Sequence, residues 1–211
     1  MNRRQILVGA LAGAGLIALA PWRAGAADTP ALQADPTTGL FPDDRVLGNR
    51  ETAKAILIEY ASLSCPHCKH FNDTIVPSIK TDWVDTGKIL YVYRDFPLNA
   101  PALWASMVAN CMEGDRYFAF IAMLYQNQEA WLGASDIQAA LRQYAQGAGM
   151  DDATFDKCIN DAAAIDRIVA GVEYAQLTYN VQGTPSIFLN GERVQPKDYQ
   201  ELSQMLADAT D

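Results

Sequence analysis

The sequence predicts an α/β protein in which one long all-helical segment interrupts a framework that contains a sheet. A strand pattern, a helical pattern and a second strand pattern follow one another over residues 55–96. Residues 99–179 are rich in Ala, Met, Leu and Gln and have little strand character. Two short strand patterns and one more helical pattern occupy residues 186–207.

The first half of the framework is a predicted β-α-β unit. Residues 55–62 (AILIEYAS) are apolar and partly β-branched, as a buried strand requires. Residues 69–87 carry apolar side chains at helical spacing and end at Gly87, and Pro77 among them predicts a kink or a break. Residues 88–96 (KILYVYRDF) form the second predicted strand.

The middle segment contains a series of amphipathic runs. Apolar residues recur every four positions at Leu103, Met107 and Cys111, and a second helix is expected from Asp115. The stretch 135–138 (SDIQ) has the spacing of a capping box before another such run. Two more helices are expected, a short one around Phe155 and Ile159 and a longer one that contains Ile165, Ile168, Val169 and Val172.

The chain ends with the signals of a hairpin and a helix. A strand pattern over residues 186–189 meets Asn190-Gly191, the strongest short hairpin signal, and residues 192–194 return antiparallel. A final amphipathic helix is expected over residues 197–207. The order β-α-β, helical insert, β-β-α predicts a thioredoxin fold with one insertion.

The first residues have the composition of an export signal. Arg3 and Arg4 precede an apolar core over residues 6–20, which is shorter than the about 20 residues of a membrane-spanning helix. The tripeptide AGA at 24–26 fits the small-x-small rule for signal-peptidase cleavage. We expect a cleaved signal, with a retained membrane anchor as the alternative. The paired arginines leave both the Sec and the twin-arginine routes open.

These patterns divide the chain into a cleaved export signal (1–26), an exposed proline-containing lead-in (27–44), a thioredoxin-like domain (45–98 and 180–211) and a helical insert (99–179). Without the signal the net charge is −12, because three of the 16 basic residues and none of the 25 acidic residues are removed. Phosphates would repel so acidic a protein, which argues against nucleic acid and anionic lipid as partners.

Two cysteines, Cys65 and Cys68, lie at the predicted strand-to-helix turn in the sequence SLSCPHCKHF. A helix N-terminus stabilises negative charge and so favours the Cys65 thiolate, and Pro66 suits the first helical position. His67 can add positive charge or a hydrogen bond to the Cys65 sulfur. A stabilised thiolate favours the reduced protein and makes the disulfide an oxidant. Cys68 is expected to be more buried and to act as the resolving thiol.

The CPHC sequence at a helix start, Thr184-Pro185 just before the hairpin, and the helical insert together resemble the DsbA-like thiol:disulfide oxidoreductases. The resemblance covers nearly all of the chain after the export signal. It implies a periplasmic oxidase that passes its disulfide to reduced, unfolded exported proteins and needs no cofactor beyond Cys65 and Cys68. It also implies reoxidation by a quinone-linked membrane partner such as DsbB.

The resemblance assigns two further site regions. An acid at the position of Glu59 lies beneath the disulfide in this family, which implies proton transfer to and from Cys68; the alternative is that strand alternation points Glu59 outward. In thioredoxin-like folds the loop at Thr184-Pro185 faces the cysteine pair through a cis peptide bond, where the Thr184 backbone can pair with an extended substrate. A trans proline in an ordinary loop is the alternative. The best-known oxidases of the family carry valine where this chain has Thr184.

Metal binding fits this sequence poorly. Zinc usually takes four ligands, whereas this chain has two histidines, both beside the cysteine pair, and no second CxxC motif. The remaining cysteines, Cys111 and Cys158, lie on apolar faces of insert helices. In an oxidising compartment we expect them to form a structural disulfide worth on the order of 4 kcal/mol, and two buried free thiols are the alternative.

Activities other than that of an oxidase are also compatible with this sequence. The same chemistry serves a disulfide isomerase or reductase, and a thioredoxin-fold chaperone or metal-thiol carrier would use the cysteines only secondarily. Family isomerases dimerise through an extra N-terminal domain. The lead-in over residues 27–44 is too short and too rich in proline for such a domain, so we expect a monomeric oxidase.

Overall fold

The computed structural model describes residues 33–35 and 37–211, so the export signal expected at 1–26 lies outside the described residues. A five-stranded sheet forms its centre, in the order β1-β3-β2-β4-β5. The β2–β3 pair is parallel and the other neighbouring pairs are antiparallel. The strands are β1 (Val46–Leu47), β2 (Ala55–Ala61), β3 (Ile89–Asp95), β4 (Ser186–Leu189) and β5 (Glu192–Val194).

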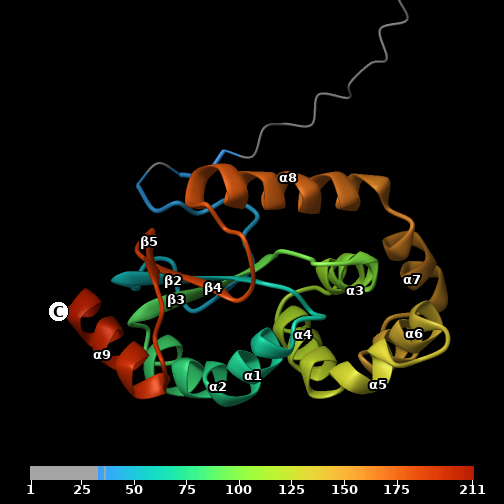
Figure 1. The fold of residues 1–211 in the computed structure, drawn as a ribbon, viewed down its shortest axis with the longest axis horizontal. Helices are drawn as coiled ribbons and strands as arrows, with labels where there is room; N and C mark the ends of the chain where they lie inside the picture. The colour runs from blue at the N-terminus through green and yellow to red at the C-terminus, as the bar shows by residue number, and fades with distance from the viewer. Residues whose placement is uncertain (1–32, 36) are drawn as a thin grey trace, which may run out of the picture.

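Helices cover both faces of this sheet. Helix α8 lies along one face, α1, α2 and α9 lie along the other, and α3 to α7 gather beyond one end of the sheet (Figure 1). Between α2 and β3 the chain forms a single π-helical segment, η1 (Lys80–Val84). The α-helices are α1 (Pro66–Thr74), α2 (Val76–Ile79), α3 (Ala100–Asn110), α4 (Arg116–Gln126), α5 (Gln128–Leu132), α6 (Ile137–Gly147), α7 (Asp152–Ile159), α8 (Ala162–Tyr179) and α9 (Tyr199–Thr210).

The predicted β-α-β unit and hairpin are present. The helical run breaks at Ile75, between α1 and α2, because Pro77 has no N–H to donate to the preceding turn. In the hairpin, Asn190 (φ 49°) and Gly191 (φ 84°) both adopt the positive φ values that a tight two-residue turn requires. The α/β class with an inserted run of helices is therefore confirmed.

Three local details differ from the predictions. Strand β1 was not predicted, because two residues are too few to show alternation. The N-cap of α6 is Asp136, whose side chain accepts from the Ala139 amide (2.9 Å), and not Ser135 of the capping-box spacing. Helix α9 begins at Tyr199 after the Asp198 cap and continues to Thr210.

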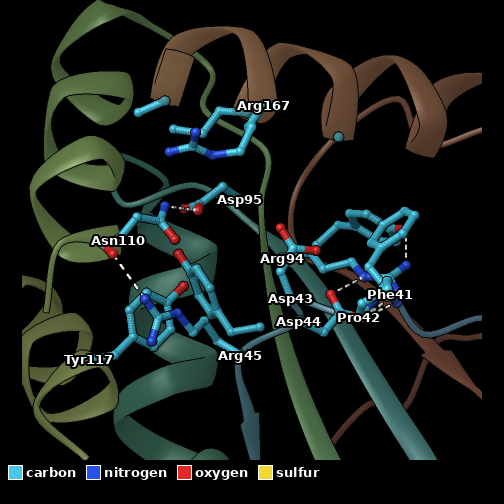
Figure 2. A pocket seen from close by; sticks show the side chains of 15 residues that line it. Phe41, Pro42, Asp43, Asp44, Arg45, Arg94, Asp95, Asn110, Tyr117 and Arg167 are labelled. Carbon is cyan, nitrogen blue, oxygen red and sulfur yellow. Dashed lines mark hydrogen bonds and ion pairs between the residues drawn. The ribbon is translucent and has the colours of Figure 1, made fainter. Parts of the chain in front are cut away.

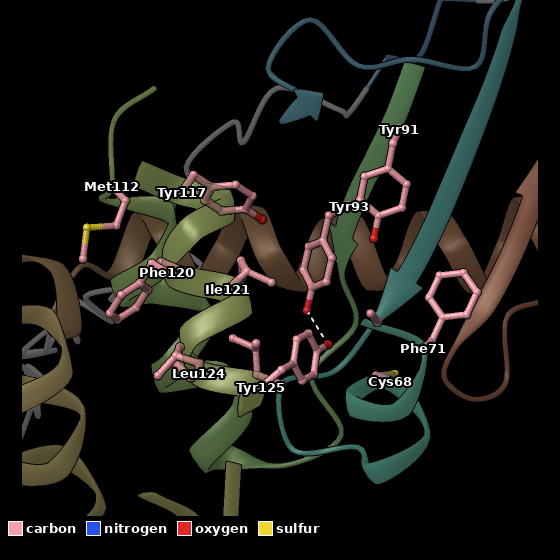
Figure 3. Close-up of a cluster of buried hydrophobic side chains, with 14 of the residues drawn as sticks. Cys68, Phe71, Tyr91, Tyr93, Met112, Tyr117, Phe120, Ile121, Leu124 and Tyr125 are labelled. Carbon is pink, nitrogen blue, oxygen red and sulfur yellow. Dashed lines mark hydrogen bonds between the residues drawn. The ribbon is translucent and has the colours of Figure 1, made fainter. Parts of the chain in front are cut away.

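The insert shares one apolar core with the sheet. One continuous cluster contains Leu57 and Tyr91 from the sheet, Phe71 from α1, and Phe120 and Trp131 from the insert. Figure 3 shows the part of this cluster between β3, α1 and α4. A second cluster on the α8 face contains the alternate residues of the strands, such as Ile58, Val92 and Phe188. Alternation along the strands therefore divides the side chains between two cores.

The lead-in is not exposed throughout, which corrects the expectation for its last residues. Phe41 is buried, and Asp44 accepts from the buried Arg94 guanidinium at 3.0 and 2.7 Å. Arg94 also donates to the Tyr60 hydroxyl and to the Gly39 carbonyl, each at 2.7 Å, and lies over the Phe41 ring (Figure 2). A buried guanidinium on β3 needs compensating acceptors, and the lead-in supplies them.

Candidate active site

Cys65 is held at the junction of β2 and α1. It is the N-cap residue of α1 with extended backbone angles, and Pro66 follows at the start of the helix. The Cys65 amide donates to the Ser62 carbonyl at 3.0 Å, which closes the turn after β2. Residues 65–68 therefore occupy the first turn of the helix, where main-chain N–H groups lack helical partners.

The two thiols of this turn differ strongly. Both are free, but Cys65 keeps 5% of its surface exposed and Cys68 keeps none. A hydrogen bond from the Cys68 thiol lowers the pKa of Cys65 to about 5, helped by the Thr184 hydroxyl and by the amides of Cys68 and His67, and opposed by burial. Burial raises the pKa of Cys68 far above its ordinary value, and Cys65 and Glu59 raise it further. One sulfur is thus set up as the nucleophile and the other as a protonated partner.

His67 contributes differently from the expectation. Its main-chain N–H favours the Cys65 thiolate, whereas its side chain is exposed. Within residues 33–35 and 37–211, no hydrogen bond joins the His67 ring to Cys65. The Cys65 thiolate is therefore stabilised chiefly by the Cys68 thiol, with help from the main-chain amides of the helix start, and not by the imidazole.

The loop before β4 meets the cysteine pair from a distant part of the sequence. The Thr184–Pro185 peptide bond is cis. The Cys65 thiol donates to the Thr184 carbonyl at 3.3 Å, although 119 residues separate them. The Thr184 hydroxyl is buried and favours the thiolate forms of both sulfurs. Among the described residues it has no hydrogen-bond partner of ordinary geometry.

Glu59 lies inside the protein, so the outward-pointing alternative is wrong. It is 0% exposed in the middle of β2 and accepts a hydrogen bond from the Tyr91 hydroxyl. Burial raises its pKa to about 8, with a smaller rise from Cys65 that the Tyr91 bond opposes. A carboxyl with this pKa holds a proton at neutral pH, near a thiol that cannot easily lose its own.

Three supporting residues escaped prediction from the sequence. The buried Gln128 of α5 donates to the Leu63 and Cys65 carbonyls at 2.8 and 3.1 Å, and Tyr125 of α4 donates to the Ser62 carbonyl at 3.2 Å. Tyr91 of β3 supports Glu59. The helical insert therefore anchors the loop that carries Cys65. No local pattern marks Gln128 or Tyr125, because each acts on residues 63 to 65 positions away.

Among residues 33–35 and 37–211, no group of three or more His, Cys, Asp or Glu side chains is placed to hold a metal ion. Over the same part of the chain, no helix is both long and apolar enough to cross a membrane. Cys111 and Cys158, 47 positions apart, are joined by a disulfide that links the end of α3 to α7.

The chain is similar to known proteins in sequence and in fold. A family model described as thioredoxin matches residues 41–208. A Rickettsia bellii protein, provisionally named a protein-disulfide oxidoreductase, is 33% identical over 159 residues, which cover 74% of this chain and 60% of that protein. The chain thus spans about 60% of the length of this curated relative.

Solved structures narrow the family. The crystal structure of Wolbachia pipientis α-DsbA1 is 30% identical, with a TM-score of 0.75 over 81% of this chain and 92% of that one. A structure titled protein-disulfide isomerase from Novosphingobium aromaticivorans is 26% identical, with a TM-score of 0.69 over 80% and 98% of the two chains. The chain therefore belongs to the DsbA-like thiol:disulfide oxidoreductases, which have the thioredoxin fold.

Proposed function

We propose that this protein is an exported thiol:disulfide oxidase that donates the Cys65–Cys68 disulfide to reduced, unfolded proteins of the periplasm. The observation that carries the proposal is the difference between the two sulfurs. A low pKa of about 5 at Cys65 stabilises the reduced protein, and so makes its disulfide a strong oxidant.

The reaction proceeds in two exchanges. A substrate thiolate attacks Cys65 Sγ, the Cys65–Cys68 bond breaks, and the electron pair passes to Cys68 Sγ, which takes up a proton. A second substrate thiolate then attacks the substrate sulfur of the mixed disulfide. Cys65 leaves as the stabilised thiolate, and the substrate keeps the new disulfide.

Substrate and partner follow from the same site. The Thr184 backbone, next to Cys65, suits main-chain pairing with an extended peptide, so unfolded chains are the proposed substrates. Reoxidation is assigned to a DsbB-like, quinone-linked membrane protein, and the working form to a monomer. Export depends on the signal proposed for residues 1–26.

The test measures redox equilibrium and peptide oxidation together. The reduced and oxidised proteins are equilibrated against glutathione mixtures, and a reduced two-cysteine peptide is used to follow disulfide transfer. We expect a more oxidising equilibrium than that of glutathione itself and rapid peptide oxidation, lost in Cys65→Ser and kept in the Cys111→Ser/Cys158→Ser control. A reducing equilibrium, or activity that survives Cys65→Ser, would falsify the oxidase proposal.

Disulfide isomerase is the second candidate, because the Novosphingobium relative carries that name. The threonine before Pro185, Thr184, is also a residue type that isomerases of the family carry at this position. An isomerase must hold a misfolded substrate, which favours a dimer. Efficient rescue of scrambled ribonuclease by a stable dimer would favour isomerase, and a monomer that rescues it poorly would favour the oxidase.

A further inference from the structure

The buried Glu59 carboxyl is connected to a cavity through one side chain. Tyr91 donates its hydroxyl to Glu59 Oε2 and is itself buried. The other oxygen, Oε1, has no hydrogen-bond partner within the described part of the chain. Tyr91 also lines a cavity of about 810 Å³. It therefore touches both the carboxyl and the cavity.

This cavity lies on the side of the sheet that faces α1 and α4. Tyr91 and Tyr93 project from β3 toward these helices, on the side where Cys68 and Phe71 lie (Figure 3). The walls are largely apolar, with Val76, Phe118 and Ile121 among them. Exposed polar residues that reach solvent also line it, namely Asp73, Lys80, Asp85, Asp115 and Gln126. A space of this size with polar groups at its floor and rim can hold water.

The proposed reaction needs a proton path at this place. Each opening of the disulfide delivers one proton to Cys68 Sγ, and each closing removes one, because burial makes a Cys68 thiolate very unfavourable. A substrate bound to Cys65 and paired with the Thr184 backbone covers the front of the site. Neither Cys65 nor Thr184 lines the cavity beside Tyr91, so a path through this cavity does not pass the residues that hold the substrate.

We propose that Tyr91 relays protons between Glu59 and water in this cavity during each exchange. The inference rests on the proposed oxidoreductase function. When the disulfide opens, Cys68 Sγ takes the proton of the Glu59 carboxyl. The carboxylate then takes the Tyr91 hydroxyl proton as the Tyr91 oxygen accepts another from cavity water. When the disulfide forms again, the same transfers run in reverse, so no charge remains on Tyr91.

Tyr91 is distinguished from the other titratable groups around Glu59. Those groups are Tyr91 and Tyr93 from β3, Tyr125 from α4, and Cys65 and Cys68 at the start of α1. On the other side β4 places the apolar Ile187 opposite Glu59. The Tyr93 and Tyr125 hydroxyls bond each other at 2.9 Å. Of these groups, Tyr91 is the one hydrogen-bonded to the Glu59 carboxyl. It therefore positions that carboxyl and relays its protons.

The test compares Tyr91→Phe with the matched variant Tyr93→Phe. A small dithiol reduces each oxidised protein, and stopped-flow rates are recorded from about pH 5 to 9 in H₂O and D₂O. We expect Tyr91→Phe to slow reduction about tenfold, with a smaller solvent isotope effect and a pH profile displaced to higher pH, while Tyr93→Phe keeps the wild-type profile. Adding Tyr91→Phe to Glu59→Gln should cause no further loss, because Tyr91 acts only through the Glu59 carboxyl.

Superimposable profiles for the two phenylalanine variants, or losses that multiply in the double variant, would overturn the relay. If Tyr91→Phe does not fold, the relay is tested with Ala122→Leu, because the larger side chain narrows the cavity. The control is Ala130→Leu, at an exposed alanine of α5 outside the cavity. If reduction by the dithiol slows threefold or more in Ala122→Leu and not in Ala130→Leu, the relay is supported. Equal reduction rates in the two variants refute it. A wild-type protein that cannot oxidise a peptide would refute the proposed function instead.

Discussion

The reactivity of Cys65 should cross that of an ordinary thiol near neutral pH. Its pKa is about 5, against 9.0 for an unperturbed cysteine. At pH 6 this difference raises its thiolate fraction about 900-fold, but intrinsic nucleophilicity falls about 60-fold over four pKa units, so Cys65 should react about 15-fold faster. At pH 9 Cys65 is fully ionised and the ordinary thiol is half ionised, so Cys65 should be about 30-fold slower. The two curves should cross near pH 7.

A small neutral disulfide probe measures these rates, with mass mapping to identify the sulfur that reacts first. Cys68→Ala removes the hydrogen bond that lowers the pKa of Cys65 most, so the pH at which the Cys65 rate reaches half of its maximum should rise. Cys68→Ser keeps a hydroxyl donor and should raise this pH less than Cys68→Ala does. A Cys65 slower than a free thiol at pH 6, a half-maximal rate near pH 9, or first labelling at Cys68 would refute this account.

Three further outcomes concern stability. With both cysteines reduced, the pKa of Glu59 rises from 4.5 in the unfolded chain to about 8 in the folded protein, so this carboxyl should destabilise the fold by up to about 5 kcal/mol as pH rises between these values. Denaturant titrations should show the wild type losing that much stability relative to Glu59→Gln over this range, and parallel curves for the two proteins would contradict the assignment. Replacing both Cys111 and Cys158 by Ser should lower the free energy of unfolding by about 4 kcal/mol while peptide oxidation is largely retained, and unchanged stability would argue against a structural role. Asp44→Ala leaves the buried Arg94 without its carboxylate and should cost about 3–5 kcal/mol in urea unfolding, whereas a change below 1 kcal/mol would mean that the pair is solvated.

Local patterns were sufficient for most of the elements. The apolar runs of β2 and β3, the Pro77 break and the Asn190-Gly191 turn each depend on residues a few positions apart, so local composition and turn chemistry predict them. The CxxC pair at a strand-to-helix turn likewise indicated the chemistry of Cys65, because a helix start favours a thiolate in any fold.

Contacts between distant segments could not be predicted in this way. The sequence left open whether Glu59 points inward, and it marked neither the Tyr91 donor nor the support of the Cys65 loop by Gln128. It also described residues 27–44 as exposed, although Asp44 neutralises Arg94, 50 positions away. Such partners are chosen because a buried polar group must be satisfied by whichever segment packs against it, and that choice is made only when the whole chain has folded.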